Sequence, residues 1–408
     1  MRPSRQVAAG DNSCNLLAEP KLNEGWCLKF LDSVRQLAYK TIRWKMLNQA
    51  IMKTHIKNLF IALVLFLTLN SRLSTARAQG SLTPSGPPGP TMKSLDQIEP
   101  RTIVNAANTP GDSGDSFIIS QPGSYYLTTN LVGVSGESGI EITANNVMLD
   151  LNGFTVQGGS VGVNGIYIPN ACTNITVRNG TVSGWGYRAA VDSESGSSIN
   201  QVFERLNVSA NTSSGIYMVG AGVVRDCNSQ NNGYIGIFCG GGIISGCTAD
   251  NNVSYGIYVF SSTVSGCLVQ NNGNGGIYVA PGTVSGCLVR NNFESGIYVD
   301  SPGSEVIGNT CIGNDTANSA GAAGIYIDDA RNRIEDNHVT ASGFAGIQVA
   351  PSFFYTNNII IKNSVEGTLG GGTGNNYITP NTQIVGPIIT NTVSGIITNS
   401  NPWANFSF

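Results

Sequence analysis

Hydrophobic and polar residues alternate in short runs along this chain, and the runs recur at a fixed spacing. The clearest repeated segment is a glycine followed by an apolar, an aromatic and a second apolar residue. Between residues 236 and 299 this segment starts every 20 residues. Its copies, including looser ones on either side, are Gly139–Ile142, Gly165–Ile168, Gly215–Met218, Gly236–Cys239, Gly256–Val259, Gly276–Val279, Gly296–Val299, Gly324–Ile327 and Gly346–Val349. A period of this length predicts one structural unit stacked on itself.

Each repeat unit contains two or three β-branched runs separated by Gly, Asn and Ser, the pattern of short strands bounded by turns. The sequence lacks the leucine spacing of leucine-rich repeats and the helices of ankyrin or tetratricopeptide repeats. A parallel β-helix fits, because residues one period apart then lie on adjacent rungs about 4.8 Å apart.

Alternation along each strand predicts which side chains point inward. In the Gly-Ile-Tyr-Val copies, Ile and Val point into the solenoid and Tyr points outward. One inward position is shared by Cys227, Cys247, Cys267 and Cys287 and continued by Asn309 and Asn337. A turn position is shared by Asn231, Asn251, Asn271 and Asn291, whose amides we expect to bond from rung to rung.

Two segments, Asn146–Val156 and Asn174–Trp185, resemble the entry rungs of secreted bacterial right-handed parallel β-helix repeat proteins, the pectin-lyase-like superfamily. The resemblance extends over about residues 101–408. It implies an all-β, single-stranded right-handed parallel β-helix of about ten rungs. It does not imply one activity, because this superfamily contains lyases, hydrolases, epimerases and adhesins.

The regions flanking the repeats divide the chain further. We expect the β-helix at 139–365, N-terminal cap strands at 101–138 and a C-terminal cap at 366–408. Caps are expected because an open solenoid end would expose unpaired strand edges. Residues 79–100 form a Pro/Gly-rich linker. The rod is predicted to be a monomer.

The N-terminal region predicts export. A short basic start at Met52–Lys57, an apolar run of 11 residues at Leu59–Leu69 and the small residues of Ala76–Ala78 together form a signal peptide at 52–78. Residues 1–51 are either a mis-assigned start or an N-terminal extension. The predicted location is secreted, periplasmic or at the cell surface, with no membrane span after signal removal.

Composition removes several functional classes. The net charge is −3 without a basic stripe, so nucleic acid is excluded as a partner. Seven cysteines follow Ala78, an odd number that cannot pair completely. We expect them to be buried packing residues, with disulfides between rungs as the alternative. No Cys-x-x-Cys or Cys/His cluster predicts a metal site.

The outward position of the Gly-Ile-Tyr-Val copies predicts an aromatic strip. Its members are Tyr217, Phe238, Tyr258, Tyr278, Tyr298 and Tyr326, and Phe260 occupies the next outward position of its rung. Sugar rings stack on flat aromatic strips, so these residues are candidates for carbohydrate binding. The alternative is that the rings only stabilise the solenoid.

Two carboxylates, Asp300 and Asp328, lie two residues beyond a Tyr on neighbouring rungs, and Asp329 and Arg331 follow. Like charges this close raise one pKa, which suits a general acid beside a base or a site for a cation such as Ca²⁺. The rung leading into the second carboxylate is 8 residues longer, with the extra residues within 313–323. The alternative is a pair of solvated turn carboxylates.

The catalytic motifs of the superfamily are incomplete in this chain. Asp328 and Asp329 resemble the Asp-Asp of polygalacturonases, but the Gly-His-Gly and Arg-Ile-Lys motifs are missing. Asp300, Asp328 and Arg331 offer the residue types of a pectate lyase without its motif. Enzyme activity is therefore left open. The leading prediction is binding of extracellular or cell-envelope polysaccharide along the aromatic strip. The alternatives are a polysaccharide lyase or glycoside hydrolase, and a structural or adhesive surface rod.

Overall fold

The structure is a computed structural model that describes residues 100–159, 162–186, 189–352, 354–368, 376–380, 382–390 and 400–408. The chain divides into two units, Met1–Thr91 and Met92–Phe408, and the description below concerns the second. The predictions for residues 1–51, 52–78 and nearly all of 79–100 lie outside the described residues.

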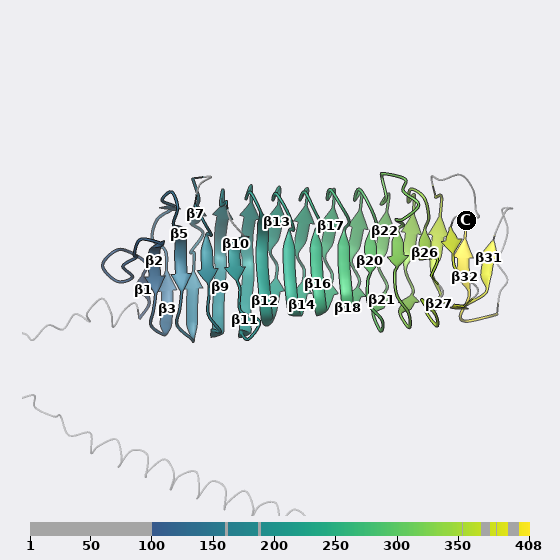
Figure 1. Ribbon diagram of the computed structural model, residues 1–408, viewed down its shortest axis with the longest axis horizontal. Helices are drawn as coiled ribbons and strands as arrows, with labels where there is room; N and C mark the ends of the chain where they lie inside the picture. The colour runs from purple at the N-terminus through teal and green to yellow at the C-terminus, as the bar shows by residue number, and fades with distance from the viewer. Residues whose placement is uncertain are drawn as a thin grey trace, which may run out of the picture. The chain divides into compact units, whose positions relative to one another are not determined.

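The second unit is a solenoid in which every strand pairs in parallel with strands one turn away (Figure 1). About 12 turns stack along its axis, close to the predicted ten. No helix occurs in the part of the chain that the structure describes, and none of the described segments is a helix long and apolar enough to cross a membrane.

Each turn contributes to three sheet faces. Face 1 contains β2 (Asp115–Ile119), β5 (Ser138–Ile142), β8 (Ile166–Ile168), β10 (Ala189–Ser193), the first parts of β12 (Ser214–Arg225), β14 (Ile237–Ser245), β16 (Ile257–Ser265) and β18 (Ile277–Ser285), then β20 (Ile297–Val299), β23 (Ile325–Ile327), β26 (Ile347–Val349) and β29 (Tyr377–Ile378). Face 2 contains β1 (Thr102–Ile103), β3 (Gly123–Tyr126), β6 (Val147–Asp150), the first parts of β9 (Thr173–Ser183) and β11 (Ile199–Ser209), the second parts of β12, β14, β16 and β18, then β21 (Glu305–Ile307), β24 (Arg333–Glu335), β27 (Ile359–Ile361) and β30 (Ile384–Val385). Face 3 contains β4 (Leu131–Val132), β7 (Thr155–Gln157), the second parts of β9 and β11, β13 (Asn228–Gln230), β15 (Thr248–Asp250), β17 (Leu268–Gln270), β19 (Leu288–Arg290), β22 (Thr310–Ile312), β25 (His338–Thr340), β28 (Ser364–Glu366), β32 (Asn405–Ser407) and, beside β32, β31 (Ile388–Thr390).

The segments expected to cap the repeats instead extend them. In 101–138, strands β1 to β4 pair in parallel with the following turns, so this segment supplies the first strands of the solenoid. In 366–408, strands β29, β30 and β32 add further parallel pairs. These turns lack the Gly-Ile-Tyr-Val segment, so the repeat period does not identify them as part of the solenoid.

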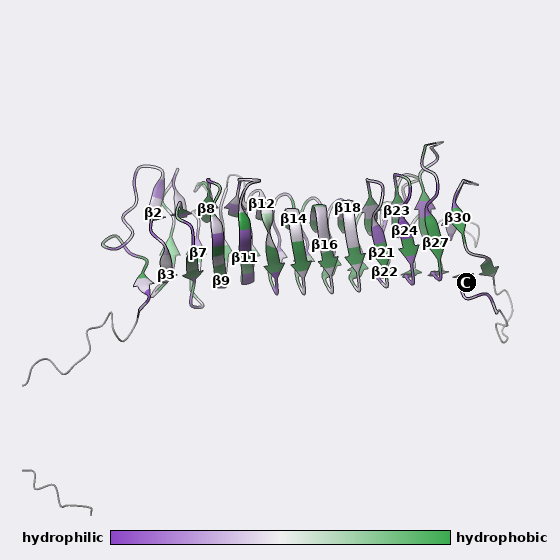
Figure 2. Ribbon diagram, turned by 90° about the horizontal axis from the view of Figure 1, so that it is seen from below, coloured by the Kyte–Doolittle hydropathy of each residue, from purple (hydrophilic) through white to green (hydrophobic). Residues whose placement is uncertain are grey.

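The interior follows the predicted alternation. Ile257, Ile277 and Val279 are fully buried, while the tyrosine between each Ile and Val points outward and is only partly buried. Figure 2 shows the strands of the central turns, β14 to β18, in white and green, whereas polar segments are prominent on β9 and β11. The hydrophobic core is therefore a continuous column inside the three faces.

Buried ladders of identical side chains close the turns. The turn between faces 3 and 1 has an inner asparagine ladder in which each side-chain amide donates to the next turn's amide oxygen at 2.8–3.1 Å. Its members are Asn211, Asn232, Asn252, Asn272, Asn292 and Asn314. The turn between faces 2 and 3 carries the cysteine ladder, which Asn309 and Asn337 continue as predicted.

Candidate functional site

The predicted aromatic positions form one continuous ladder on face 1. Strand pairing places each ring opposite the next, from Tyr217 through Phe238, Tyr258, Tyr278 and Tyr298 to Tyr326. All five successive ring pairs are stacked, with centroids 4.0–5.9 Å apart and planes within 25° of parallel. The six rings therefore form a single stack along the solenoid axis.

The geometry of this stack differs from the flat strip that the sequence predicts. Because each ring covers a face of its neighbour, the stack presents ring edges and phenol hydroxyls outward, while most ring faces are covered. Tyr258 and Tyr278, at 4.0 Å and 7°, leave no room for a sugar between them. Ring stacking of this kind stabilises a sheet by roughly 0.5–1.5 kcal/mol per pair beyond area burial. Any ligand of this surface would contact edges and hydroxyls.

Two further aromatic side chains fix the stack from its sides. Phe260, which is 38% exposed, packs edge-on against Phe238, Tyr258 and Tyr278 at centroid distances of 5.9, 5.4 and 6.4 Å. Tyr255 lies just before β16 and packs edge-on against Tyr258 of its own solenoid turn and Tyr278 of the next one. The period does not reveal Tyr255, because the corresponding positions in neighbouring turns are not consistently aromatic.

The two predicted carboxylates lie at the C-terminal end of this ladder, each beside a tyrosine. The Tyr278 hydroxyl donates to Asp300, and the Tyr298 hydroxyl donates to Asp328 at 2.5 Å. Each tyrosine lies one turn before its carboxylate, so the pairs cross between turns. Burial, followed by the hydrogen bond to the carboxylate, raises the pKa of both tyrosines, so both stay protonated donors at neutral pH.

The other two predicted site residues have different partners. A carboxylate oxygen of Asp329 accepts the Ala330 N–H at 2.6 Å. Arg331 has a left-handed backbone (φ 59°), and its N–H donates to the Thr356 carbonyl at 3.0 Å. No ion pair of Arg331 occurs among the described residues.

Tyr355 is a member of this cluster that sequence reasoning missed. The charge of Asp328, followed by burial and the charges of Asp329 and Asp300, raises the pKa of Tyr355, and its ring packs against the buried cluster that contains Tyr326. It lies in an irregular turn after β26, outside the repeated segment, and so the sequence offers no positional signal for it. Burial and the charge of Asp328 also raise the pKa of Tyr326, so the cluster contains four tyrosines, Tyr278, Tyr298, Tyr326 and Tyr355, and three carboxylates.

The longer rung lies beside this cluster, as predicted. Asp315 anchors it: this carboxylate is fully buried and accepts the N–H groups of Ser319 and Phe344 at 2.9 and 2.6 Å. Gln348 pairs with Tyr326 on the next turn of face 1, and its side-chain amide donates to the Ala320 carbonyl at 3.2 Å. The insertion thus covers the end of the aromatic ladder.

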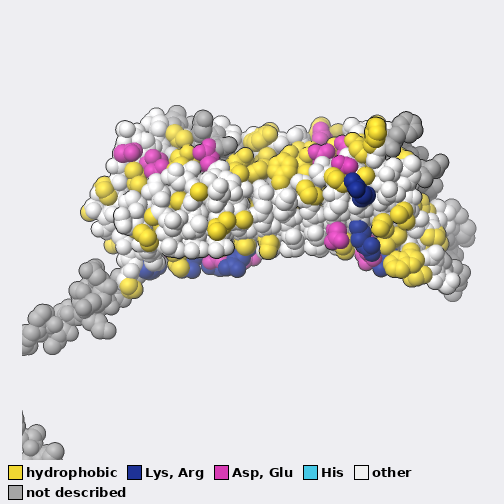
Figure 3. Space-filling model, turned by 60° about the horizontal axis from the view of Figure 1, so that its bottom comes forward, with side chains coloured by type: hydrophobic (Ala, Val, Ile, Leu, Met, Phe, Trp, Pro, Cys, Tyr) yellow, Lys and Arg dark blue, Asp and Glu magenta, His cyan; other side chains and the backbone are white. Residues whose placement is uncertain are grey.

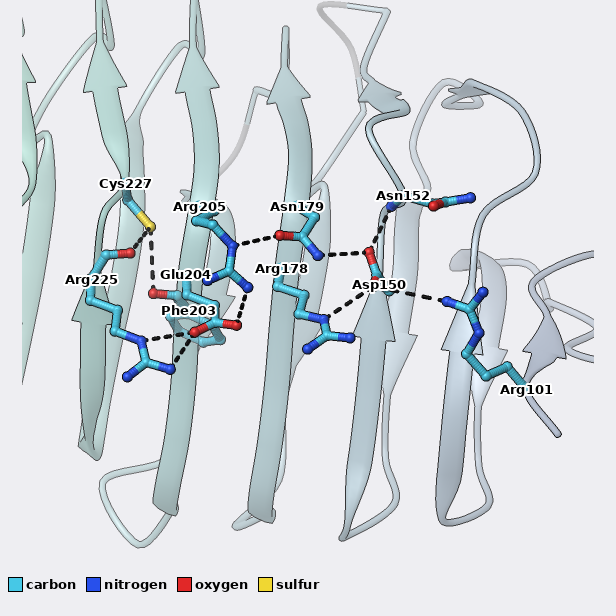
Figure 4. Close-up of polar contacts among 10 residues, drawn as sticks. All are labelled: Arg101, Asp150, Asn152, Arg178, Asn179, Phe203, Glu204, Arg205, Arg225 and Cys227. Atoms are coloured by element: carbon cyan, nitrogen blue, oxygen red, sulfur yellow. Dashed lines mark hydrogen bonds and ion pairs between the residues drawn. The ribbon is translucent and has the colours of Figure 1, made fainter. Parts of the chain in front are cut away.

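Face 2 carries a charge ladder that the sequence did not suggest (Figure 4). Strand pairing alternates Asp150, Arg178, Glu204 and Arg225 on successive turns. Arg178 Nε donates to Asp150 at 3.1 Å, and Arg225 Nε donates to Glu204 at 2.8 Å. Burial alone would raise the pKa of both carboxyl groups, but their arginine partners and hydrogen bonds hold it below the usual range. A second group joins Glu335 to Arg333 and to Lys362.

The surface charges are thus unevenly distributed. In Figure 3 the basic side chains gather in two groups on the visible face, and the surface between them shows none. At the outward strand positions of face 1, none of the described residues is Lys or Arg. Basic residues pair on face 2, whereas face 1 presents aromatic edges and carboxylates.

The seven described cysteines are buried free thiols. In the ladder, the Cys247 and Cys267 thiols each donate to the carbonyl two residues earlier at 3.4 Å. The neighbouring thiols and burial raise the pKa of both to about 12, so neither is a thiolate at neutral pH. No group of three or more metal-ligating side chains occurs within the described ranges.

Comparison with known proteins agrees with this architecture. Residues 132–311 match the protein-family model described as "Right handed beta helix region". The Dettilon tailspike protein (gp208) has a similar structure with 16% identity and a TM-score of 0.52; the match covers 66% of this chain and 62% of the tailspike, less than two thirds of its length. The A-module of mannuronan C-5 epimerase AlgE4 from Azotobacter vinelandii has 16% identity and a TM-score of 0.48, covering 60% of this chain and 80% of the module. No curated protein sequence matches significantly.

These observations define the class: the chain is a right-handed parallel β-helix repeat protein, as the sequence resemblance implied. At this level of identity the structural likeness concerns the fold alone, and the function must be argued from the surface of this chain.

Proposed function

We propose that this protein is exported and binds a neutral polysaccharide along face 1. The observation that carries the proposal is the six-ring ladder, four of whose tyrosines are partly exposed and whose C-terminal end carries two tyrosine–carboxylate pairs. Export is supported by the signal peptide predicted at 52–78.

The chemistry of face 1 suits a hydroxylated chain. Tyrosine combines an apolar ring edge with a polar hydroxyl, and an ionised carboxylate can accept about four hydrogen bonds. Tyr278 and Tyr298 each use one acceptor site of their carboxylate, and Asp328 also has Tyr355 as a hydrogen-bond partner. A carboxylate has more acceptor sites than these, and a sugar hydroxyl can donate to them. Similar groups recur on each turn, about 4.8 Å apart, which favours a polymer over a single sugar.

Charge favours a neutral polymer over a polyuronate. Asp300, Asp328 and Asp329 lie at one end of the ladder, and no basic side chain occupies a described outward strand position of face 1. Like charges brought together across an interface disfavour binding. A polyuronate would therefore need a cation such as Ca²⁺ between its carboxylates and those of the protein.

Hydrolysis of the bound chain is the second candidate, favoured by one observation. Asp300 and Asp328 follow paired strands on adjacent turns, as a retaining glycosidase with carboxylates about 5–5.5 Å apart would require. Against it, each carboxylate already accepts a hydrogen bond from a tyrosine. A lyase is less favoured, because Arg331 has no contact with either carboxylate among the described residues.

The test is a binding and turnover assay on the purified full chain. Neutral polysaccharides (hydroxyethyl cellulose and xyloglucan) and polyuronates (polygalacturonate and alginate) are cast into native gels, with and without Ca²⁺. Parallel solutions are followed for new reducing ends and for the ultraviolet absorbance of unsaturated uronates. We expect retardation by a neutral polymer without new ends. Reducing ends alone would establish a hydrolase, reducing ends with absorbance would establish a lyase, and no retardation anywhere would leave the structural rod.

Paired variants locate the binding surface. Tyr278→Phe with Tyr298→Phe removes both hydroxyls while keeping the ring stack, and we expect weaker retardation. The matched control is Tyr377→Phe, which removes a hydroxyl of a ring packed against the core near the C-terminal end, where it bonds to the Asn363 and Phe406 carbonyls. Equal retardation of both variants would contradict binding on face 1.

A further inference from the structure

A polar groove of about 550 Å³ runs beside the turns that connect face 3 to face 1, outside the aromatic ladder. Its lining includes the exposed turn asparagines Asn231, Asn251 and Asn271 and, between them, Gly233, Val253 and Gly273. This volume lies within the range of ligand sites, about 300–1,000 Å³. None of the lining residues is charged, so the groove differs in chemistry from both face 1 and the arginine ladder of face 2.

The groove ends where the residue that follows each inner-ladder asparagine becomes large. The residue after each inner-ladder asparagine donates its N–H to the asparagine carbonyl of the previous turn, at 2.8–3.0 Å for Gly233, Val253, Gly273 and Phe293. Within the groove this position is occupied by Gly233, Val253 and Gly273. On the next turn it is Phe293, half exposed, beside the insertion whose Ala317 N–H donates to the Phe293 carbonyl. The groove therefore ends where the regular turns end.

The two asparagine ladders of this turn have different hydrogen-bonding capacity. The buried inner ladder is saturated: Asn252 Nδ2 donates to Asn272 Oδ1 and to the Ser229 carbonyl, and its Oδ1 accepts from both nitrogens of Asn232. The exposed outer ladder is not. Among the described residues, Asn251 makes one side-chain hydrogen bond, to Asn231 at 2.5 Å, and Asn271 makes one, to Asp250 at 2.9 Å.

An asparagine amide can form about four hydrogen bonds, two as donor and two as acceptor. The outer ladder therefore presents free donors and acceptors on each turn, about 4.8 Å apart, above a rigid floor. Its backbone is in the left-handed region, with φ of 54–55° at Asn231, Asn251 and Asn271, so the three side chains leave the backbone in the same direction on successive turns.

We propose that this groove is a second polysaccharide-binding site, which takes a neutral sugar chain lying along the solenoid axis and bonded by the outer asparagine amides. The inference rests on the proposed function for its ligand class, and it assigns a surface that the aromatic ladder does not include. Neutral hydroxyls match uncharged amides, which donate and accept equally well, whereas the groove lining offers no opposite charge to a carboxylate or an ammonium group.

The test is affinity electrophoresis of the full chain in native gels containing hydroxyethyl cellulose, xyloglucan or polygalacturonate. The triple variant Asn231→Gly, Asn251→Gly, Asn271→Gly removes the outer amides, and glycine adopts the same left-handed backbone without strain. We expect it to bind a retarding neutral polymer about tenfold more weakly than wild type, the loss of a few modest hydrogen bonds. Circular dichroism and thermal unfolding report whether the fold is kept.

The matched control is Asn291→Gly, which removes the next amide of the same ladder, at φ 53°, outside the groove lining. If the control binds the polymer as wild type does and the triple variant binds it more weakly, the result supports polysaccharide binding in the groove. Wild-type binding by a folded triple variant, with loss in the Tyr278→Phe, Tyr298→Phe variant, overturns the groove and leaves the face 1 proposal intact. Retardation by polygalacturonate alone overturns the neutral ligand class, and no retardation in any gel overturns both proposals.

Discussion

The central turns and the C-terminal turns of this solenoid share an interior but differ at the surface. From Tyr258 to Tyr298 the outward aromatic position recurs every 20 residues, whereas the next steps, to Tyr326 and Gln348, take 28 and 22 residues. Strand pairing is unbroken across both regions. The extra residues therefore leave the strands unchanged and lengthen the connections between them.

This difference places two kinds of candidate site along one scaffold. The central turns carry most of the aromatic ladder and the asparagine groove. The C-terminal turns carry the carboxylates, the tyrosine hydroxyl bonds and the insertion anchored by Asp315. Because each turn bonds only to its neighbours, a turn can lengthen without disturbing distant ones.

The largest expected effect tests whether the interior is equally stable in both regions. Asn272 in the central turns and Asn337 in the C-terminal turns each make four buried hydrogen bonds of the same kind. Replacing either by Ala leaves buried partners unsatisfied, and we expect a loss of roughly 3–6 kcal/mol in unfolding free energy. Chemical denaturation measures it.

The control for this pair is Asn271→Gly, which changes the exposed neighbour of Asn272 and keeps its left-handed backbone. We expect a change within about 0.5 kcal/mol. If Asn272→Ala and Asn337→Ala differed by more than their combined error, the shared interior would not be uniform and the comparison would fail.

The next effect concerns acid stability, which the charged ladders outside the central turns should control. The pKa of Glu204 in the folded protein lies below its ordinary 4.5, because its arginine partners outweigh burial. On acidification, the Glu204 carboxylate therefore takes up a proton at a higher pH in the unfolded chain than in the folded protein. The stabilisation is fully present above pH 4.5 and is lost as pH falls through the lower folded value.

Glu204→Gln should lower the unfolding free energy at pH 7 by roughly 2 kcal/mol, as for hydrogen bonds to a charged group. It should also reduce the loss of stability on acidification, measured by denaturant midpoints from pH 7 to pH 3. Glu294→Gln is the control, since this glutamate makes no ion pair among the described residues. A variant that lost stability on acidification as steeply as wild type would show that this carboxylate does not titrate as stated.

The sequence predicted the scaffold well because the scaffold is periodic. Alternation alone assigned Ile277 and Val279 to the core, and spacing alone placed Tyr258, Tyr278 and Tyr298 in one register. Periodicity gives the position of a ring but not its orientation, so the sequence leaves a flat strip and mutual ring stacking as alternatives, and the structure shows the stack. A side-chain torsion depends on neighbours in the adjacent turns.

The residues that sequence reasoning missed lie where the period is broken or absent. Tyr355 comes from an irregular turn, and the Asp150–Arg178–Glu204–Arg225 ladder falls in early turns of unequal length. The first turns, 101–138, were assigned to a cap because they lack the repeated segment. In each case the sequence does not show which residues pair between adjacent turns, because the turns differ in length.

A smaller effect distinguishes the tyrosine–carboxylate pairs from the rest of the aromatic ladder. Tyr298→Phe removes the hydrogen bond to Asp328, and we expect a loss of about 1 kcal/mol, since the pair is only partly buried. Tyr326→Phe is the control, because its hydroxyl makes no hydrogen bond among the described residues. Thermal unfolding of both variants measures the difference, and equal midpoints would show that the Tyr298 bond contributes nothing to stability.

The smallest expected effect tests the cysteine ladder, where the central and C-terminal turns use different residues at one inward position. Cys267 is 2% exposed, its thiol donates to the Ser265 carbonyl, and its N–H donates to the sulfur of Cys287 on the next turn. Asn309 instead links its turn to the next by a hydrogen bond between side-chain amides. Cys267→Ala removes one small buried group, so we expect a loss of about 1 kcal/mol, far less than for Asn337→Ala. Because the thiols are free, wild-type denaturant midpoints should be the same with and without dithiothreitol. A midpoint lowered by the reductant would instead indicate a disulfide between turns and a covalent link that the asparagine turns do not have.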